Sequence, residues 1–207
     1  MPPNTKVDFL DTHQDRSKKT LDDLLQAAYK IVEDADPNAF NSRNLADKAG
    51  YALGTINKRL GAVENVFLWA IEKGREHKLQ DLIDLITELD PHTTIQEFSA
   101  EVVYIAFRNI GTVGPKVMRY YENKLIKRLG SSSDSMDFSA IFTEPYLAML
   151  NANQSNTFRK MSLDETRLVM RTTQALIERP FINNDPIAGS DEHRRIAVES
   201  LIRILGK

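Results

Sequence analysis

The chain has 207 residues, no cysteine and a formal net charge of −2. Without cysteine it has no disulfide, no catalytic thiolate and no cysteine-ligated zinc, and a chain so close to neutrality is not a strongly basic nucleic-acid coat protein. Its 42% hydrophobic and 27% charged residues are the ordinary balance of a soluble folded protein. The sequence opens with no secretory signal, and no run reaches the roughly 18 apolar residues of a membrane span. We therefore expect a cytoplasmic protein with no membrane partner.

The first part of the chain has the pattern of three short helical segments followed by a long one. Apolar residues recur at steps of three and four from Leu21 to Val32, which predicts an amphipathic helix. A short helix should follow with Ser42 as its N-cap, and Gly50 suits a left-handed turn at its end. A second short helix at about 53–60 and a long helix at about 63–89 complete this part.

The remaining sequence repeats helices and polar breaks on a larger scale. Thr94 and Ser162 each stand three residues before a glutamate, and these capping boxes open helices that run to Ile110 and to about Glu178. Three further helices are expected at about 116–129, 137–152 and 191–205. Because no strand alternation appears, the sequence predicts an all-α protein of about nine helices.

The strongest functional signal lies in residues 42–60, where two short helices flank Ala49, Gly50 and Tyr51. A small residue lets two helices cross closely, a glycine makes the turn, and the second helix keeps a polar outer face. This is the arrangement that a helix-turn-helix requires. An eight-residue helix fits the major groove of B-DNA, with its N-terminal half at the base edges.

The run from Asn44 to Leu60 resembles the signature of the TetR family of transcriptional regulators. That signature is roughly Ile-Ala-x-x-Ala-Gly-Val-Ser-x-Gly-Thr-Leu-Tyr-x-His-Phe, and seven positions match it or differ conservatively: Leu45, Ala46, Ala49, Gly50, Gly54, Thr55 and Ile56. The sequence departs from the family where Asn57 replaces its Tyr, Arg59 its His and Leu60 its Phe. Val63 also stands where the family often has a phosphate-contacting Lys.

The resemblance implies a helix-turn-helix DNA-binding domain at residues 17–62 and a helical ligand-binding and dimerisation domain at residues 63–207. It also implies how such a protein works. A homodimer binds a palindromic operator in double-stranded DNA as a repressor and releases it when a small-molecule effector binds. It implies no cofactor, no metal and no catalytic residue.

Position within the motif assigns the DNA contacts. We predict six contact residues: Arg43, Leu53, Thr55, Asn57, Lys58 and Arg59. Asn57 suits adenine, while Lys58 suits guanine or phosphate. Leu53 has two interpretations, since it stands where the family often has a DNA-facing residue and would then touch a thymine methyl, but its spacing to Ile56 also permits burial. The alternative for the charged residues is an ordinary solvated surface.

The resemblance implies an effector pocket among the helices from 95 to 150. We predict that it is lined by Tyr104, Phe107, Arg108, Met118, Tyr121, Phe142 and Tyr146. A pocket of this composition favours an apolar or aromatic effector. The other interpretation is that aromatic and methionine side chains at helical spacing form a plain hydrophobic core.

Two apolar stripes near the end of the chain predict a dimer interface. Its residues are Leu168, Thr172, Leu176, Ala197, Leu201 and Ile204. In the family the last two helices pair with their twins in a four-helix bundle, and the alternative is that both pack only on their own chain. A two-fold dimer would place two recognition helices about one DNA turn, or a small multiple of it, apart.

The sequence leaves two alternatives to DNA binding, an enzyme and a binding or adaptor protein. An enzyme is disfavoured because the sequence has no carboxylate-rich metal spacing, no serine-centred elbow and no glycine-rich phosphate loop. A helical ligand-binding or adaptor protein that has lost sequence-specific DNA binding is the stronger rival. The near-neutral charge and the replaced Tyr and Lys of the signature favour it.

Overall fold

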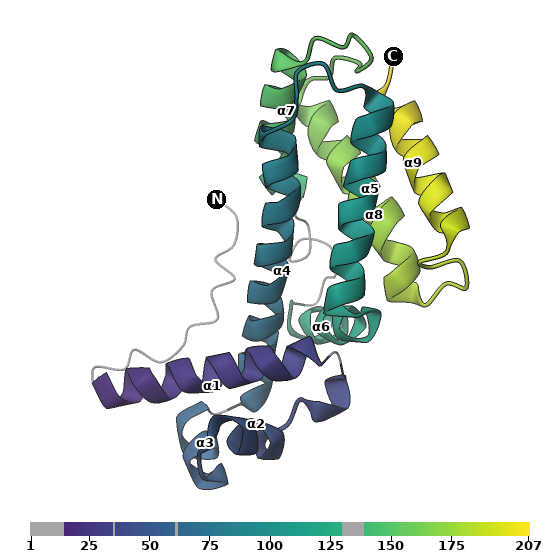
Figure 1. Ribbon diagram of the computed structural model, residues 1–207. Helices are drawn as coiled ribbons and strands as arrows, with labels where there is room; N and C mark the ends of the chain where they lie inside the picture. Colours follow the sequence, from purple (N-terminus) through teal and green to yellow (C-terminus); the bar gives the residue numbers. More distant parts are fainter. Residues whose placement is uncertain (1–14, 35, 61, 130–138) are drawn as a thin grey trace. The chain divides into compact units, whose positions relative to one another are not determined.

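The computed structural model describes residues 15–34, 36–60, 62–129 and 139–207, and within these ranges it is helical almost throughout (Figure 1). The elements are α1 (Asp15–Glu33), η1 (Pro37–Ala39, a 3-10 turn), α2 (Ser42–Ala49), α3 (Leu53–Leu60), α4 (Val63–Thr87), α5 (Ile95–Val113), α6 (Pro115–Leu129), α7 (Ser139–Ala152), α8 (Leu163–Asn183) and α9 (Asp191–Leu205). The described residues contain one isolated bridge, between Phe158 and Gly206. The prediction of an all-α protein with about nine helices is confirmed.

Side-chain caps begin α2, α5, α8 and α9. The Glu97 carboxylate accepts hydrogen bonds from both the backbone N–H and the hydroxyl of Thr94, each at 2.8 Å, so the predicted capping box is present. The sequence pattern predicts Ser42 as the N-cap of α2, but the N-cap is Asn41. Asn41 is extended, with φ −140°, and its side chain accepts from the Asn44 N–H, while Ser42 is already the first helical residue.

Two helices run further than their sequence patterns indicated. α5 continues through Gly111 to Val113, because the residue that leaves the right-handed helix is Gly114, with φ 84°. α8 continues through Pro180 to Asn183 and ends on Asn184, a left-handed residue with φ 56°. Pro180 has no N–H to donate to the Leu176 carbonyl four residues earlier, and Nε2 of His193 lies 3.3 Å from that carbonyl oxygen.

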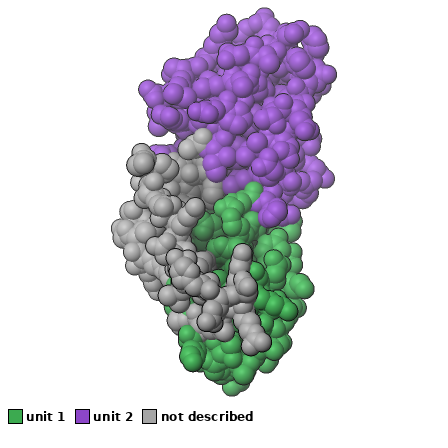
Figure 2. All heavy atoms as spheres, turned by 90° about the vertical axis from the view of Figure 1, so that its left-hand side faces the viewer, with its two compact units in different colours: residues 1–76, 112–135 green, residues 77–111, 136–207 purple. Residues whose placement is uncertain are grey.

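The backbone divides into two compact units (Figure 2). Unit 1 comprises residues 1–76 and 112–135, and unit 2 comprises residues 77–111 and 136–207. Unit 1 therefore combines α1, α2 and α3 with the first part of α4 and with α6. Unit 2 holds the second part of α4 together with α5, α7, α8 and α9.

Unit 1 is built around apolar side chains of its first four helices. Leu24, Leu45 and Ile56 have no exposed surface. Phe40, which follows η1, stacks on Phe67 of α4 at 4.9 Å between ring centroids and meets Tyr120 of α6 edge to face at 5.1 Å. These contacts join α6 to the helices at the start of the chain.

Unit 2 has its own aromatic core, in which a histidine takes part. His193 of α9 is 2% exposed and lies against the rings of Phe107 and Phe181. The Gly189 N–H donates to its Nδ1, and its Nε2 lies 3.3 Å from the Leu176 carbonyl oxygen. Through these two contacts His193 links α9 to the end of α8 and to the loop that follows it. No helix in the described ranges is long and apolar enough to cross a membrane.

Candidate nucleic-acid interface

The turn between α2 and α3 is built by a left-handed glycine. Gly50 has φ 73°, and the N–H groups of Gly50 and Tyr51 both donate to the Ala46 carbonyl. This pattern closes a helix whose last carbonyls would otherwise lack partners. On the other side of the turn the Ala52 carbonyl accepts from the N–H groups of Thr55 and Ile56, at 2.8 and 3.3 Å. The predicted helix-turn-helix backbone is therefore present.

A hydrogen bond from α1 supports this turn. The Tyr51 hydroxyl donates to the Asp23 carboxylate at 2.7 Å, in a partly buried position. Sequence reasoning missed this pair, because the two residues are 28 positions apart and neither stands out in its own segment. The bond holds the turn of the helix pair on the first helix.

α3 has one buried side and one exposed side. Ile56 has no exposed surface, and Leu60 and Thr55 are half-buried. Asn57 and Lys58 are exposed, as predicted for residues that face DNA. Thr55 is thus less available than the sequence suggested, since its side chain lies at the edge of the packed side.

The structure excludes the burial of Leu53 in the core of its helix pair. Its side chain is 44% exposed, so it does not join Ile56 in the core. Arg43 of α2 is also exposed. Arg59 belongs to α3, but its side chain lies outside the described residues. Five of the six predicted contact residues can therefore be placed, and Leu53, Arg43, Asn57 and Lys58 are available to a partner molecule.

The charge of this region differs from that of the whole chain. α3 carries Lys58 and Arg59 and has no acidic residue, although the complete chain has a net charge of −2. α2 adds Arg43 and Lys48 against a single Asp47. A local excess of cationic residues on exposed helices is what attraction to a phosphate backbone requires.

The residues predicted to line an effector pocket are divided between the two units. Met118 and Tyr121 are buried in unit 1, whereas the other five belong to unit 2. Within unit 2, Tyr104 is 55% exposed, and Arg108 pairs with Asp81 at 3.0 Å on the surface.

The remaining three predicted residues lie in or beside the core of unit 2. Phe107 packs against Phe181 and His193, Tyr146 lies 5.9 Å from Phe98 between ring centroids, and Phe142 is half-buried. Phe107 and Tyr146 are buried among these side chains.

Unit 2 contains buried polar atoms that its own side chains do not satisfy. Across the described ranges, four such atoms of unit 2 have no hydrogen-bond partner: Ser99 Oγ, Asn109 Oδ1, the Tyr146 hydroxyl and Thr173 Oγ1. Burial raises the pKa of Tyr146 well above its usual value, so this hydroxyl keeps its proton. Buried polar groups without partners are rare in folded proteins, and they mark an interior with spare hydrogen-bonding capacity.

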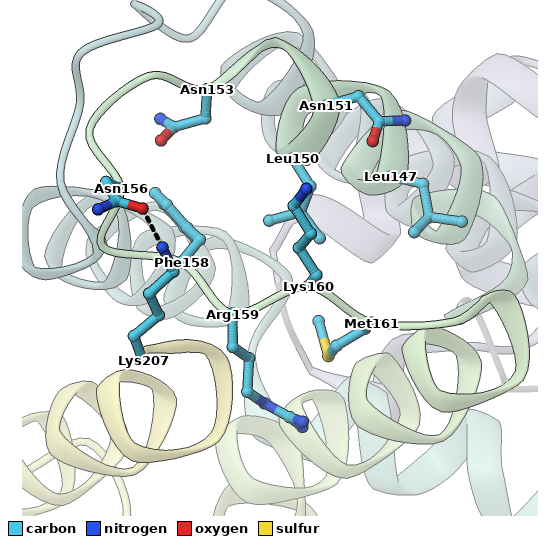
Figure 3. Close-up of a pocket in the computed structure, with 10 residues that line it drawn as sticks. All are labelled: Leu147, Leu150, Asn151, Asn153, Asn156, Phe158, Arg159, Lys160, Met161 and Lys207. Carbon is cyan, nitrogen blue, oxygen red and sulfur yellow. Dashed lines mark hydrogen bonds between the residues drawn. The ribbon is translucent and has the colours of Figure 1, made fainter.

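A pocket of about 180 Å³ lies where α7 leads into α8 (Figure 3). Leu147, Leu150, Asn151, Asn153, Asn156, Phe158, Arg159, Lys160, Met161 and Lys207 line it. It contains none of the predicted effector residues. Two of its cations already have partners, since Arg159 pairs with Glu165 at 2.6 Å and the Lys207 ammonium donates to Asn156.

The predicted dimer residues separate into accessible and inaccessible positions. Leu168 is 64% exposed and Thr172 is exposed on the same face of α8, with Leu176 and Ile204 half-buried. Ala197 and Leu201 have no exposed surface, because they face the core of their own unit. A second chain therefore has no direct access to these two side chains, and α8 offers the more accessible face.

No protein-family model and no curated protein matches the sequence, but solved structures resemble the chain over most of its length. A TetR-family transcriptional regulator from Mesorhizobium loti superposes with a TM-score of 0.60 at 15% identity, over 94% of this chain and 100% of that one. A TetR-family member from Streptomyces coelicolor A3 gives 0.52 at 16% identity, over 90% and 98%. The multidrug binding protein EbrR, complexed with imidazole, gives 0.52 at 15% identity, over 89% and 94%. The chain thus has the fold of TetR-family regulators, which confirms the fold that the signature implied.

Proposed function

We propose that this chain, which has the fold of TetR-family regulators, is a transcriptional regulator that places α3 in the major groove of double-stranded DNA. The observation that carries the proposal is the two-sided character of α3. Ile56 is fully buried, while Asn57 and Lys58 are exposed on a helix without acidic residues. A helix-turn-helix with this distribution has the shape, charge and hydrogen-bonding groups for base readout.

Each exposed side chain has a matching group on DNA. The Asn57 amide suits the N6 and N7 edge of adenine, and the Lys58 ammonium suits guanine or a phosphate. Arg43 and Arg59 supply further phosphate contacts, which orient the protein without reading sequence. These roles predict an affinity that falls steeply as salt rises.

The proposal includes a homodimer that binds a palindromic operator as a repressor and acts in the cytoplasm. Leu168 and Thr172 on the exposed face of α8 supply accessible positions for a two-fold contact. Two identical heads related by a two-fold axis read a palindrome, because each head meets the same half-site.

The proposal also includes release from DNA by a small apolar or aromatic effector. The unsatisfied buried atoms of unit 2, such as the Tyr146 hydroxyl and Ser99 Oγ, support an effector that carries at least one polar group. EbrR, which has the same fold, is described as a multidrug binding protein and holds imidazole. To release DNA, the effector must bind the DNA-free state more tightly than the DNA-bound state.

The test of the proposal is selection from a random duplex library by the purified full chain at moderate salt. We expect a palindromic sequence, bound with an affinity that falls linearly in a plot of log affinity against log salt. A folded protein that recovers no duplex would overturn DNA binding. That outcome would favour the helical ligand-binding or adaptor alternative.

A paired substitution links the selected duplex to α3. The variant Asn57→Ala with Lys58→Ala should lose at least about thirtyfold in affinity, since each base contact is worth about 1–3 kcal/mol, while its oligomeric state stays unchanged. Lys160→Ala is the matched control, because Lys160 is an exposed lysine of unit 2. Equal losses in both variants would mean that only general charge matters.

A further inference from the structure

An exposed leucine marks the start of α3. Leu53 is 44% exposed, and it is the large hydrophobic residue with substantial exposure on the α2–α3 pair as far as the structure describes it. Its neighbour Ala52 is exposed as well. A side chain at Gly54 would find no heavy atom within 4 Å, so the glycine leaves open space beside the leucine. The start of α3 therefore has the small residues Ala52 and Gly54, and the exposed Leu53 side chain projects beside them.

Leu53 and Asn57 lie on the same face of α3, because residues four positions apart are neighbours on a helix surface. Ile56 is buried and does not share this face. The rise of four helical residues is about 6 Å, and two base-pair steps of B-DNA cover about 7 Å. Side chains at these positions can meet base pairs that are at most about two steps apart.

The major groove offers a leucine one apolar partner. Guanine, cytosine and adenine present only hydrogen-bonding groups there, and thymine adds its C5-methyl group. A leucine placed over a polar edge would remove water from that edge without replacing the hydrogen bond, which is unfavourable.

We infer that Leu53 is a specificity-determining residue that contacts the C5-methyl group of a thymine, within about two base pairs of the adenine contacted by Asn57. This inference rests on the proposed function and narrows it to half-sites that contain such a thymine–adenine pair. Gly54 contributes by letting the helix tip approach the base edges closely.

The test removes the methyl group and leaves every hydrogen bond in place. Each thymine of the selected operator is replaced in turn by deoxyuridine, which differs from thymidine only by that methyl. Loss of one buried methyl contact should weaken binding about fourfold per half-site, and about fifteenfold when both half-sites are changed. The effect should occur at one thymine per half-site.

The variant Leu53→Ala identifies the side chain responsible. It should bind the thymine operator more weakly and no longer distinguish thymine from deoxyuridine at that position. Ile141→Ala is the matched control, since Ile141 is similarly exposed, at 45%, on α7 of unit 2, and it should keep the full deoxyuridine effect. A melting curve checks that both variants remain folded.

The outcomes separate this inference from the function on which it rests. Sequence-specific binding without any deoxyuridine effect would overturn the role of Leu53 and leave DNA binding standing. An effect that persists unchanged in Leu53→Ala would also overturn it, because another group would then contact the methyl. Failure to select any duplex would overturn both.

Discussion

Two glycines only four residues apart in the helix pair have different reasons to be glycine. Gly50 has φ 73°, a backbone conformation that costs other residues free energy even though its surroundings have room for a Cβ. Gly54 is helical and equally uncrowded. The backbone therefore explains Gly50, whereas nothing in the folded chain requires a glycine at position 54. A close approach to DNA is the function we propose for it.

The same substitution should have opposite effects at these two positions. Gly50→Ala should lower the free energy of unfolding by about 1 kcal/mol, because alanine disfavours the left-handed region. Gly54→Ala should raise it by about 0.5 kcal/mol, because alanine loses less backbone entropy in a helix. Urea unfolding of both variants measures the two values. Destabilisation by Gly54→Ala would show that this glycine has a structural role after all.

The Tyr51–Asp23 hydrogen bond should contribute measurably to the stability of the head. Tyr51→Phe removes the hydroxyl that donates to the carboxylate at 2.7 Å, and the expected loss is about 1–2 kcal/mol. A double-mutant cycle with Asp23→Ala should give a coupling energy of about 1 kcal/mol. Purely additive losses would mean that the two side chains do not interact in solution.

At the scale of elements, α6 is joined to the start of α4 by charged and aromatic contacts within unit 1. Arg75 is 5% exposed and lies over the Tyr121 ring, at 5.7 Å from its centroid. Lys124 pairs with Glu64 at 2.5 Å. Burial, with a smaller effect of the Glu72 carboxylate, raises the pKa of Tyr121 to about 12. The α4–α6 contact therefore depends on keeping this phenol neutral.

The pKa of Tyr121 predicts how stability changes at high pH. Below about pH 10 the phenol is neutral in both the folded and unfolded chain, and its contribution is complete. Between pH 10 and about 12 only the unfolded state loses the proton, so the free energy of unfolding should fall by up to about 2 kcal/mol relative to Tyr121→Phe. Urea unfolding of both proteins from pH 9 to 11.5 measures the difference. A constant difference would contradict the shifted pKa.

Tyr146 does not interfere with that comparison. Its pKa is also raised by burial, but it is present in both proteins, so its contribution cancels in the difference. The alkaline titration of the remaining groups cancels in the same way.

At the scale of the whole molecule, a proposed dimer needs surface that each chain does not use itself. On α9, Ala197 and Leu201 are buried in the core of their own unit, whereas Leu168 on α8 is 64% exposed. A two-fold contact brings the same patch of both chains together. The exposed face of α8 is thus the part of the predicted interface that is open to a partner.

A charge at Leu168 should dissociate the proposed dimer. Leu168→Glu places two carboxylates in a self-complementary interface, and like charges there cost several kcal/mol, which corresponds to at least about a hundredfold weaker association. Tyr104→Glu is the control, since Tyr104 is similarly exposed, at 55%, on α5. Sedimentation equilibrium measures both. An unchanged dimer in Leu168→Glu would place the contact elsewhere.

Local sequence patterns are sufficient to predict the helical content, most helix ends and the helix-turn-helix. These features rest on local rules, namely the spacing of apolar residues, the capping box at Thr94 and the need for a glycine at position 50. Where neighbouring residues competed for one local role, as Asn41 and Ser42 did for the N-cap of α2, the pattern alone chose the wrong one.

Which apolar side chains are covered depends on contacts made in the folded chain. A stripe on a helix shows that one face will be buried, but it does not show whether the covering surface belongs to the same chain. Leu53 is left exposed, whereas Ala197 and Leu201 are buried by their own unit. The predicted effector residues were likewise divided between two units. Burial and grouping depend on contacts between residues distant in sequence, which no local pattern contains.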